Sequence, residues 1–301
     1  MFERIVVPLD GSDESEQIIP YAADLARAVG ASLDLLRVVN TSDPALAKHS
    51  AGHAFTQVVG ILRKEAEGYL NTVGANVGLH NVRVNTIVEE GSAATVITDV
   101  AGRNPGTVVA LATHGKVGLG RLFSGSVADE VLRNTSCPVL LLGPHHAERV
   151  GVGFGAAIVP LDGSELGEKA LPLASGLSRA LGTDLVLLRV QPASENLLEV
   201  ATVGTDAAAS EADQLALNYL HAVRDDLKRD GAHSSEQRLV YGKPADGIME
   251  VAREVEAEHP GTFIIMTTHG RSGALRLALG SVADSVVSSA QQPVLVIHPS
   301  S

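Results

Sequence analysis

The sequence predicts an α/β protein with two tandem doubly wound domains, each a five-stranded parallel sheet with helices on both faces. A chain of 301 residues has room for about two domains of ordinary size. The chain repeats itself, and within each copy short apolar runs alternate with longer helical patterns. Because these apolar runs are continuous, we expect strands that are buried on both faces, as in a parallel sheet.

The two copies are related by a nearly constant offset. Ile5–Ser12 returns as Ala157–Ser164, 152 residues later. Thr113–Pro144 aligns without gaps to Thr268–Pro299, with 16 of 32 positions identical. Between the copies lies a segment with alternating glycines, a composition typical of a flexible linker. The expected organisation is a first domain at 1–146, a glycine-rich linker at 147–155 and a second domain at 156–301.

Each copy is expected to follow the order βαβαβαβαβ, with strands in the β-branched and leucine-rich runs and helices in the longer patterns between them. In the first copy, strands are expected near 5–9, 33–39, 82–88, 108–111 and 139–142, and helices near 15–29, 53–73, 93–102 and 126–133. In the second copy, strands are expected near 157–161, 185–190, 236–240, 263–266 and 294–297, and helices near 165–181, 207–229, 245–258 and 281–289. Such sheets bind ligands beyond the carboxyl ends of their strands, where the strand order reverses. We therefore expect functional residues after the first and fourth strand of each copy.

Composition excludes several classes of partner and location. The net charge is −12, and both halves are acidic, so a nucleic-acid partner is not expected. Aromatic residues make up 3% of the chain, which also argues against base stacking on aromatic side chains. A single cysteine cannot form an intrachain disulfide. There is no run of 18 apolar residues and no basic-then-apolar leader at the start, so a cytoplasmic protein without membrane contact is expected.

A carboxylate follows the first strand of each copy. Asp10-Gly11-Ser12 returns as Asp162-Gly163-Ser164, which places an acceptor where the donors of a ligand could reach it. The alternative is structural, because Asp and Ser commonly cap helices and glycine is common in turns. On that interpretation Ser12 or Asp13 caps the following helix. The residues alone leave both interpretations open.

A glycine-rich loop follows the fourth strand of each copy. Nine residues separate Gly115 from Gly125, and nine separate Gly270 from Gly280. Each loop leads into a helix whose free amides and positive dipole end favour a phosphate. Glycines allow backbone amides to approach anionic oxygens. Two cations occur at matching loop positions of each copy: Lys116 and Arg271, and Arg121 and Arg276. The alternative is a tight loop with solvated cations.

Several other site motifs are missing from the sequence. There is no G-x-x-x-x-G-K-[ST] segment, so the chain is not a P-loop NTPase. The alternating glycines of the linker do not join a strand to a helix, which rejects a dinucleotide fingerprint. Neither G-x-S-x-G, H-E-x-x-H nor C-x-x-C occurs.

With these residues, the chain resembles the ATP-binding universal stress proteins in their tandem two-domain form. The most specific element is the second half of that family's motif, G-2x-G-9x-G-[ST], which occurs twice. The resemblance implies that Asp10 and Asp162 contact adenine and that the main chain of Val38 and Val190 meets the base. It implies a ribose and phosphate site in each copy. The remaining residues of these sites are Ala112, His114, Gly115, Lys116, Gly118, Arg121, Gly125, Ser126 and Val127, and Thr267, His269, Gly270, Arg271, Gly273, Arg276, Gly280, Ser281 and Val282.

The resemblance has one departure, at the first glycine of the motif. That position holds Ala112 in the first copy and Thr267 in the second. A methyl group is a small obstacle, whereas a branched threonine could crowd a ribose. Nucleotide binding is therefore expected to be tighter in the first copy.

The expected function is that of an ATP-binding stress or dormancy regulator, with Mg²⁺ bridging the phosphates rather than held by a protein metal site. An enzyme is not expected. The alternatives are a slow ATPase or a phosphoryl or adenylyl transferase, for which His114, His269 and the two strand-end aspartates are candidates. A third alternative is a nucleotide-free adaptor.

The resemblance also implies how the chain associates. In the family, the fifth strand mediates dimer formation, so here it should join the two halves within one chain. Other surfaces would then be available for a homodimer and for an unidentified protein partner.

Overall fold

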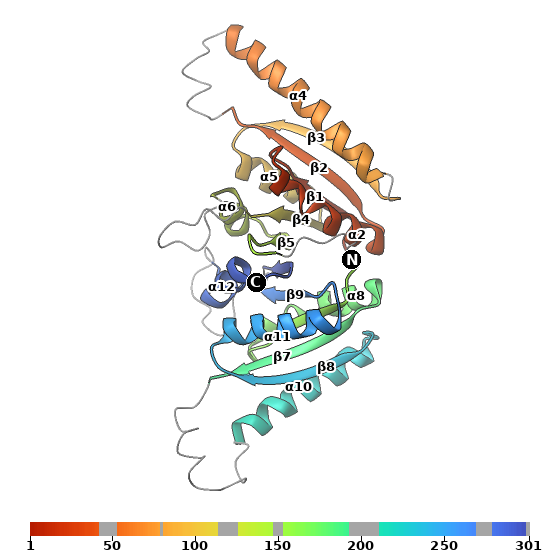
Figure 1. The fold of residues 1–301 in the computed structure, drawn as a ribbon, viewed down its shortest axis with the longest axis vertical. Helices are drawn as coiled ribbons and strands as arrows, with labels where there is room; N and C mark the ends of the chain where they lie inside the picture. Colours follow the sequence, from red (N-terminus) through yellow and green to blue (C-terminus); the bar gives the residue numbers. More distant parts are fainter. Residues whose placement is uncertain are drawn as a thin grey trace. The chain divides into compact units, whose positions relative to one another are not determined.

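The structure of the chain is a computed structural model. It describes residues 1–41, 53–78, 81–113, 126–146, 153–192, 211–268 and 279–298. The chain divides into two compact units, Met1–Val152 and Gly153–Ser301. The α/β fold class is confirmed in both units, since each contains a parallel sheet flanked by helices (Figure 1).

In the first unit, five parallel strands are ordered β3-β2-β1-β4-β5. The strands are β1 (Arg4–Pro8), β2 (Ser32–Val39), β3 (Arg83–Glu90), β4 (Thr107–Ala112) and β5 (Val139–Leu142). The helices are α1 (Asp13–Glu16), α2 (Ile19–Val29), α4 (His53–Gly78), α5 (Ala93–Gly102) and α6 (Ser126–Asn134). Because the chain moves outward from β1 to β3 and then returns to β4, right-handed crossovers place α2 and α4 on one face and α5 and α6 on the other.

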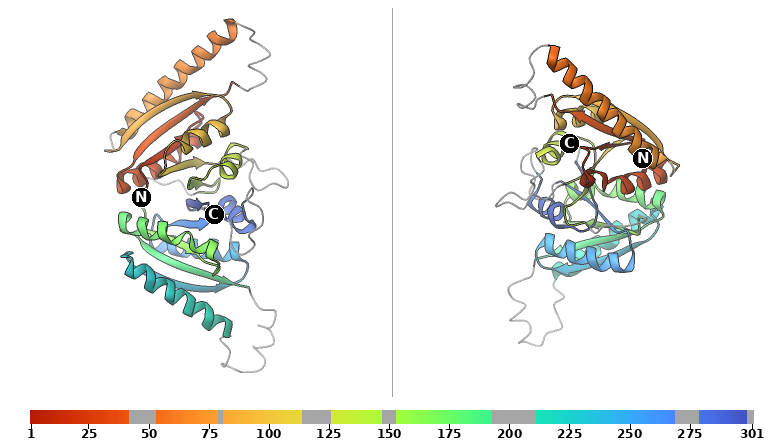
Figure 2. Two further views of the ribbon diagram at one scale, coloured as in Figure 1. Left: turned by 180° about the vertical axis from the view of Figure 1, so that it is seen from behind. Right: turned by 45° about the horizontal axis from the view of Figure 1, so that its top comes forward.

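The second unit repeats this arrangement, with the strand order β8-β7-β6-β9-β10. Its strands are β6 (Ala156–Pro160), β7 (Asp184–Gln191), β8 (Ser235–Tyr241), β9 (Phe263–Thr267) and β10 (Val294–Ile297). Its helices are α7 (Glu165–Glu168), α8 (Leu171–Leu181), α10 (Glu211–Arg229), α11 (Pro244–Glu258) and α12 (Ser281–Ser289). In the two opposite views, α8 and α10 cover one face of this sheet and α11 lies on the other (Figure 2).

The predicted first helix of each copy is wrong in one respect, because it is two helices. In the first unit α1 ends at Glu16 and α2 begins at Ile19, with Pro20 in its first turn. The second unit has the same break before Pro172. A proline has no N–H to donate to the carbonyl four residues earlier, and its ring clashes with that carbonyl, so a continuous helix is interrupted.

The expectation that strands are buried on both faces holds for the central strands and fails for β3 and β8. Ile5, Val6 and Val7 of β1 are fully buried, as are Val108 and Val109 of β4. Residues of β3 and β8 are instead half-buried or exposed. These two strands end the strand order of their units, and an edge strand with polar side chains resists pairing with other chains.

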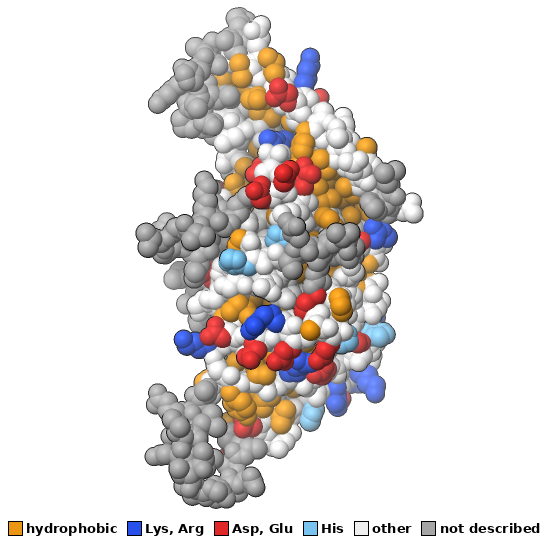
Figure 3. All heavy atoms as spheres, viewed as in Figure 1, with side chains coloured by type: hydrophobic (Ala, Val, Ile, Leu, Met, Phe, Trp, Pro, Cys, Tyr) orange, Lys and Arg blue, Asp and Glu red, His pale blue; other side chains and the backbone are white. Residues whose placement is uncertain are grey.

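The charged surface of the described residues is mixed. On the face drawn in Figure 3, most lysine and arginine side chains lie beside acidic ones. Arg238 illustrates this, because its guanidinium contacts Glu236, Glu254 and Glu258 at 2.6, 3.2 and 3.3 Å. None of the helices in the described ranges is both long and apolar enough to cross a membrane.

Candidate functional site

Each unit has a cavity at the carboxyl ends of its strands, where the strand order reverses. In the first unit the reversal lies between β1 and β4, and in the second between β6 and β9. The first cavity has a volume of about 780 Å³ and the second about 340 Å³. Both volumes are in the range of small-molecule sites. The position agrees with the expectation that ligands bind beyond the first and fourth strands.

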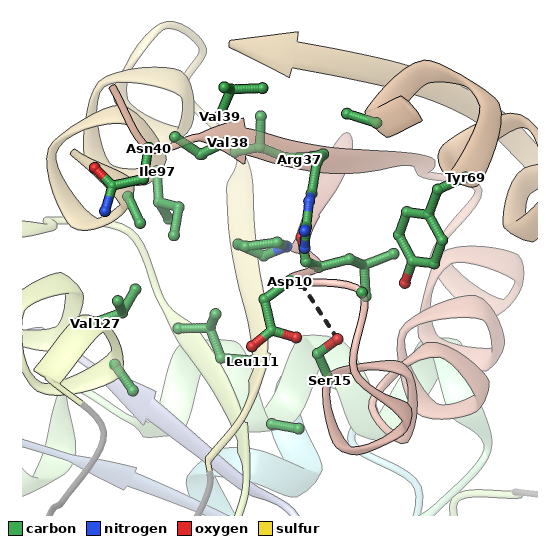
Figure 4. A pocket seen from close by; sticks show the side chains of 18 of the residues that line it. Asp10, Ser15, Arg37, Val38, Val39, Asn40, Tyr69, Ile97, Leu111 and Val127 are labelled. Atoms are coloured by element: carbon green, nitrogen blue, oxygen red, sulfur yellow. Dashed lines mark hydrogen bonds between the residues drawn. The ribbon is translucent and has the colours of Figure 1, made fainter. Parts of the chain in front are cut away.

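The first cavity brings together four of the predicted site residues. Asp10 comes from the turn after β1, Val38 from β2, Ala112 from the end of β4 and Val127 from the start of α6. They are distant in sequence and meet because parallel strands end at the same edge of the sheet. In Figure 4, Asp10 and Val127 lie on opposite sides of the cavity, with Leu111 between them.

The second cavity brings together six predicted residues, which come from the same places in the repeated fold. They are Asp162, Val190, Thr267, Gly280, Ser281 and Val282. Ser281 is the first residue of α12, and the Gly280 amide donates to the carbonyl of Thr268 at 2.8 Å. The N-terminus of α12 therefore faces the cavity, where free amides of the first helical turn favour an anion. Thr267 is buried in the wall.

Most of the predicted loop residues lie outside the described residues. These are His114, Gly115, Lys116, Gly118, Arg121 and Gly125 in the first unit, and His269, Gly270, Arg271, Gly273 and Arg276 in the second. Ser126 is the first residue of α6.

The structure confirms the capping interpretation of the Asp-Gly-Ser segment, and it also places Asp10 in the wall of the cavity. Ser12 is the N-cap of α1, and its hydroxyl accepts a hydrogen bond from the Ser15 amide at 3.2 Å. Asp10 Oδ1 in turn accepts from the amide of Ser12 at 3.0 Å and from its hydroxyl at 2.5 Å. The second unit repeats these contacts between Asp162 and Ser164, at 3.0 and 2.6 Å. The capping network thus fixes a carboxylate at the mouth of each cavity.

Sequence reasoning missed several side chains that line the first cavity, notably Arg37, Asn40, Tyr69 and Ile97. A signal was available for two of them. Arg37 interrupts an apolar strand and recurs as Arg189. Tyr69 recurs as Tyr219 in a chain with only four tyrosines.

No three His, Cys, Asp or Glu side chains of the described ranges are grouped so that they could hold a metal ion.

Comparison with known proteins identifies the family. The model of the universal stress protein family matches residues 1–143 and 154–298. The chain therefore belongs to the universal stress protein family and carries two copies of its domain in tandem.

Relatives with the same tandem length support this assignment. A universal stress protein of Mycolicibacterium smegmatis is 25% identical, over 98% of this chain and 97% of its own. Universal stress protein Rv2005c of Mycobacterium tuberculosis is 24% identical over the same shares. A crystal structure of a universal stress protein from Archaeoglobus fulgidus has a TM-score of 0.71 at 20% identity, covering 98% of this chain and 96% of that one. At this identity the structural likeness bears on the fold alone.

Proposed function

We propose that this chain is a nucleotide-dependent regulator that binds ATP with Mg²⁺ in the cavities of both units. The main support for the proposal is an arrangement of a carboxylate and a helix N-terminus that occurs in both units. In each unit, a carboxylate fixed after the first strand and the start of the helix that follows the glycine-rich loop line the same cavity. The carboxylate suits the amino group of adenine, and the helix N-terminus suits phosphates. The apolar lining between them, with Val38 and Leu111 in the first unit, suits a planar base.

Mass spectrometry of the purified chain under native conditions tests the proposal most directly. We expect co-purified ATP, in as many as two copies per chain. An empty chain that also fails to take up added ATP would contradict the proposal.

Purified protein should bind ATP in preference to GTP. The carboxylate of Asp10 or Asp162 can accept from the adenine amino group but would face a guanine carbonyl. One mispaired polar group that the ligand covers costs about 1–3 kcal/mol, which corresponds to a preference of roughly 5-fold to 150-fold. Calorimetric titration with each nucleotide measures this preference, and equal affinities would defeat the adenine assignment.

The double variant Asp10→Asn/Asp162→Asn sharpens that titration. Asparagine keeps the oxygen that accepts from Ser12 or Ser164 but adds an amide donor that can meet a guanine carbonyl. We expect the preference for ATP to shrink while the fold persists. Asp24→Asn is a control outside both cavities, because Asp24 pairs with Arg27 on α2.

Turnover of ATP should be slow or absent. The chain has no Walker lysine, and the glycine-rich loops contain no recognisable catalytic carboxylate pair or arginine finger. We expect steady-state phosphate release well below about 1 per second, the lower end for dedicated kinases. A rate at or above that value would favour an enzyme.

The regulatory part of the proposal rests on the family resemblance and on composition. On that basis the protein acts in the cytoplasm, forms homodimers and passes its nucleotide state to a protein partner. Analytical ultracentrifugation with and without ATP tests whether occupancy changes assembly.

A further inference from the structure

An arginine lies beside the base-side carboxylate of each cavity. Arg37 extends from β2 toward the turn that carries Asp10, and its Nη1 donates to the Leu9 carbonyl at 3.1 Å (Figure 4). In the second unit, Nη1 of Arg189 donates to the Leu161 carbonyl at 3.2 Å. Each of these carbonyls belongs to the residue immediately before the aspartate. Both arginines therefore bind the main chain that leads into the site.

The guanidinium of Arg37 also packs directly against the turn. Gly11 has φ +82°, in the region that favours glycine. A Cβ at this position would lie 3.3 Å from Arg37 Nη1. Arg37 thus packs against Gly11, the residue after Asp10, and binds the carbonyl of Leu9, the residue before it.

A tyrosine and a glutamate hold this arginine in place. The centre of the Arg37 guanidinium lies 5.8 Å from the centroid of the Tyr69 ring, within the range of a cation–π contact. The Tyr69 hydroxyl donates to Glu16 Oε1 at 2.8 Å. Burial, together with the Glu16 carboxylate, raises the pKa of Tyr69, so the hydroxyl stays protonated and continues to donate.

These contacts form a continuous network around Asp10. Glu16 belongs to α1, and the N-cap of that helix, Ser12, donates to Asp10. The network therefore connects the Asp10 carboxylate through α1 to Tyr69 and Arg37. Arg37 in turn contacts the main chain on both sides of Asp10. It links β1, α1, β2 and α4.

The second unit contains the same set of side chains. Glu168, Arg189 and Tyr219 occupy the positions of Glu16, Arg37 and Tyr69. Burial and the Glu168 carboxylate raise the pKa of Tyr219. The Tyr219 hydroxyl is buried and has no hydrogen-bond partner among the described residues, so the contact that the second unit shares with the first is that of Arg189 with the Leu161 carbonyl.

We propose that Arg37 and Arg189 are positioning residues, which hold the turn so that Asp10 and Asp162 face the base of the bound nucleotide. This inference rests on the proposed ATP site, and it adds the residues that make the site selective for adenine. The arginines act through the main chain of the turn. Their loss should therefore weaken recognition of adenine and leave the ribose and phosphate part of the site unchanged.

The test compares the full chain with the double variant Arg37→Met/Arg189→Met, by calorimetric titration with ATP and with GTP. Methionine keeps an unbranched stem but donates no hydrogen bond. We expect ATP affinity to fall about tenfold, the effect of losing one well-placed polar contact, with GTP affinity unchanged. Arg→Lys at both positions should restore part of the preference, because lysine can donate to the carbonyl but lacks the planar fork.

Two controls separate positioning from general effects. Arg27→Met/Arg103→Met removes the same charge from exposed residues and should leave both affinities unchanged. Tyr69→Phe removes only the hydroxyl that donates to Glu16. It should give a smaller loss of ATP selectivity in the first unit of a folded chain, even if the methionine variant unfolds.

The outcomes are distinct. Equal loss of ATP and GTP affinity would show that the arginines support the cavity or its charge as a whole, and this would overturn the positioning role. Unchanged ATP affinity in a folded methionine variant would overturn it as well. If the parent chain shows no preference for ATP, the proposed function fails first, and the arginine inference fails with it.

Discussion

In the Gly280→Val variant, the second unit is expected to lose its nucleotide while the first unit keeps its own. Gly280 is the N-cap of α12 and lines the second cavity, next to the amides of the first helical turn. A branched side chain here would stand between those amides and a phosphate. Hydrogen bonds to a charged group are worth about 1.5–3 kcal/mol each, so losing one or two lowers affinity by roughly 10-fold to more than 100-fold.

The backbone at Gly280 makes this a clean substitution. Its φ is −62° and its ψ 151°, which is extended backbone that any residue adopts. Valine at this position does not have to adopt a positive φ, so it should act through its side chain alone. Gly280→Ser is the matched control, because serine is a favoured N-cap residue and adds little bulk. We expect the serine variant to keep both its stability and most of its affinity.

The corresponding change in the first unit is Gly125→Val, which alters a residue outside the described ranges. Each single variant isolates the opposite site, so calorimetry on the pair compares the two. The first unit should bind more tightly, because Ala112 lines the larger cavity and the branched Thr267 lines the smaller one. If Gly125→Val leaves the tighter site intact, or if both variants bind like the parent, the loop assignment is wrong.

Asp34→Ala is expected to destabilise the first unit by about 3–5 kcal/mol, the usual result of leaving one buried charge without its partner. The Asp34 carboxylate accepts from Arg4 Nε at 2.5 Å and from Asn85 Nδ2 at 2.8 Å. The two charged side chains are only 11% and 8% exposed. The three residues lie near the starts of β1, β2 and β3, at the opposite end of the sheet from the cavity. Nucleotide binding should therefore survive in the folded fraction.

The second unit supplies the control for this prediction. Ala156 and Val186 stand where the first unit has Arg4 and Asp34, and both are buried. The double variant Arg4→Ala/Asp34→Val should therefore recover most of the lost stability, since apolar replacement of a buried ion pair is often neutral. Urea unfolding, monitored by circular dichroism, measures this recovery. For Asp34→Ala, we expect the urea concentration at the unfolding midpoint of the first unit to fall by more than about 1 M. Equal destabilisation of both variants would refute the explanation.

The sequence alone predicts the repeat, the order of strands and helices, and the edge of the sheet at which Asp10 and Val127 meet. These features depend on local patterns. A continuous apolar run such as Val139–Leu142 indicates a buried strand from its own residues, and the repeat supplies an independent second copy of each pattern. Pro20 and Pro172 also carried a local signal for the break between α1 and α2 and between α7 and α8.

The contacts between side chains distant in sequence depend on the tertiary structure. Arg37 and Leu9 are 28 residues apart, and Tyr69 and Glu16 are 53 apart. Their contacts arise once β1 and β2 pair in register and α4 packs across them. The same holds for Arg4 with Asp34, and for the polar surface of β3, which follows from its place at the end of the strand order. Local periodicity encodes an element and its buried face, whereas the partner across that face depends on strand pairing and helix packing, which the sequence specifies only through the whole fold.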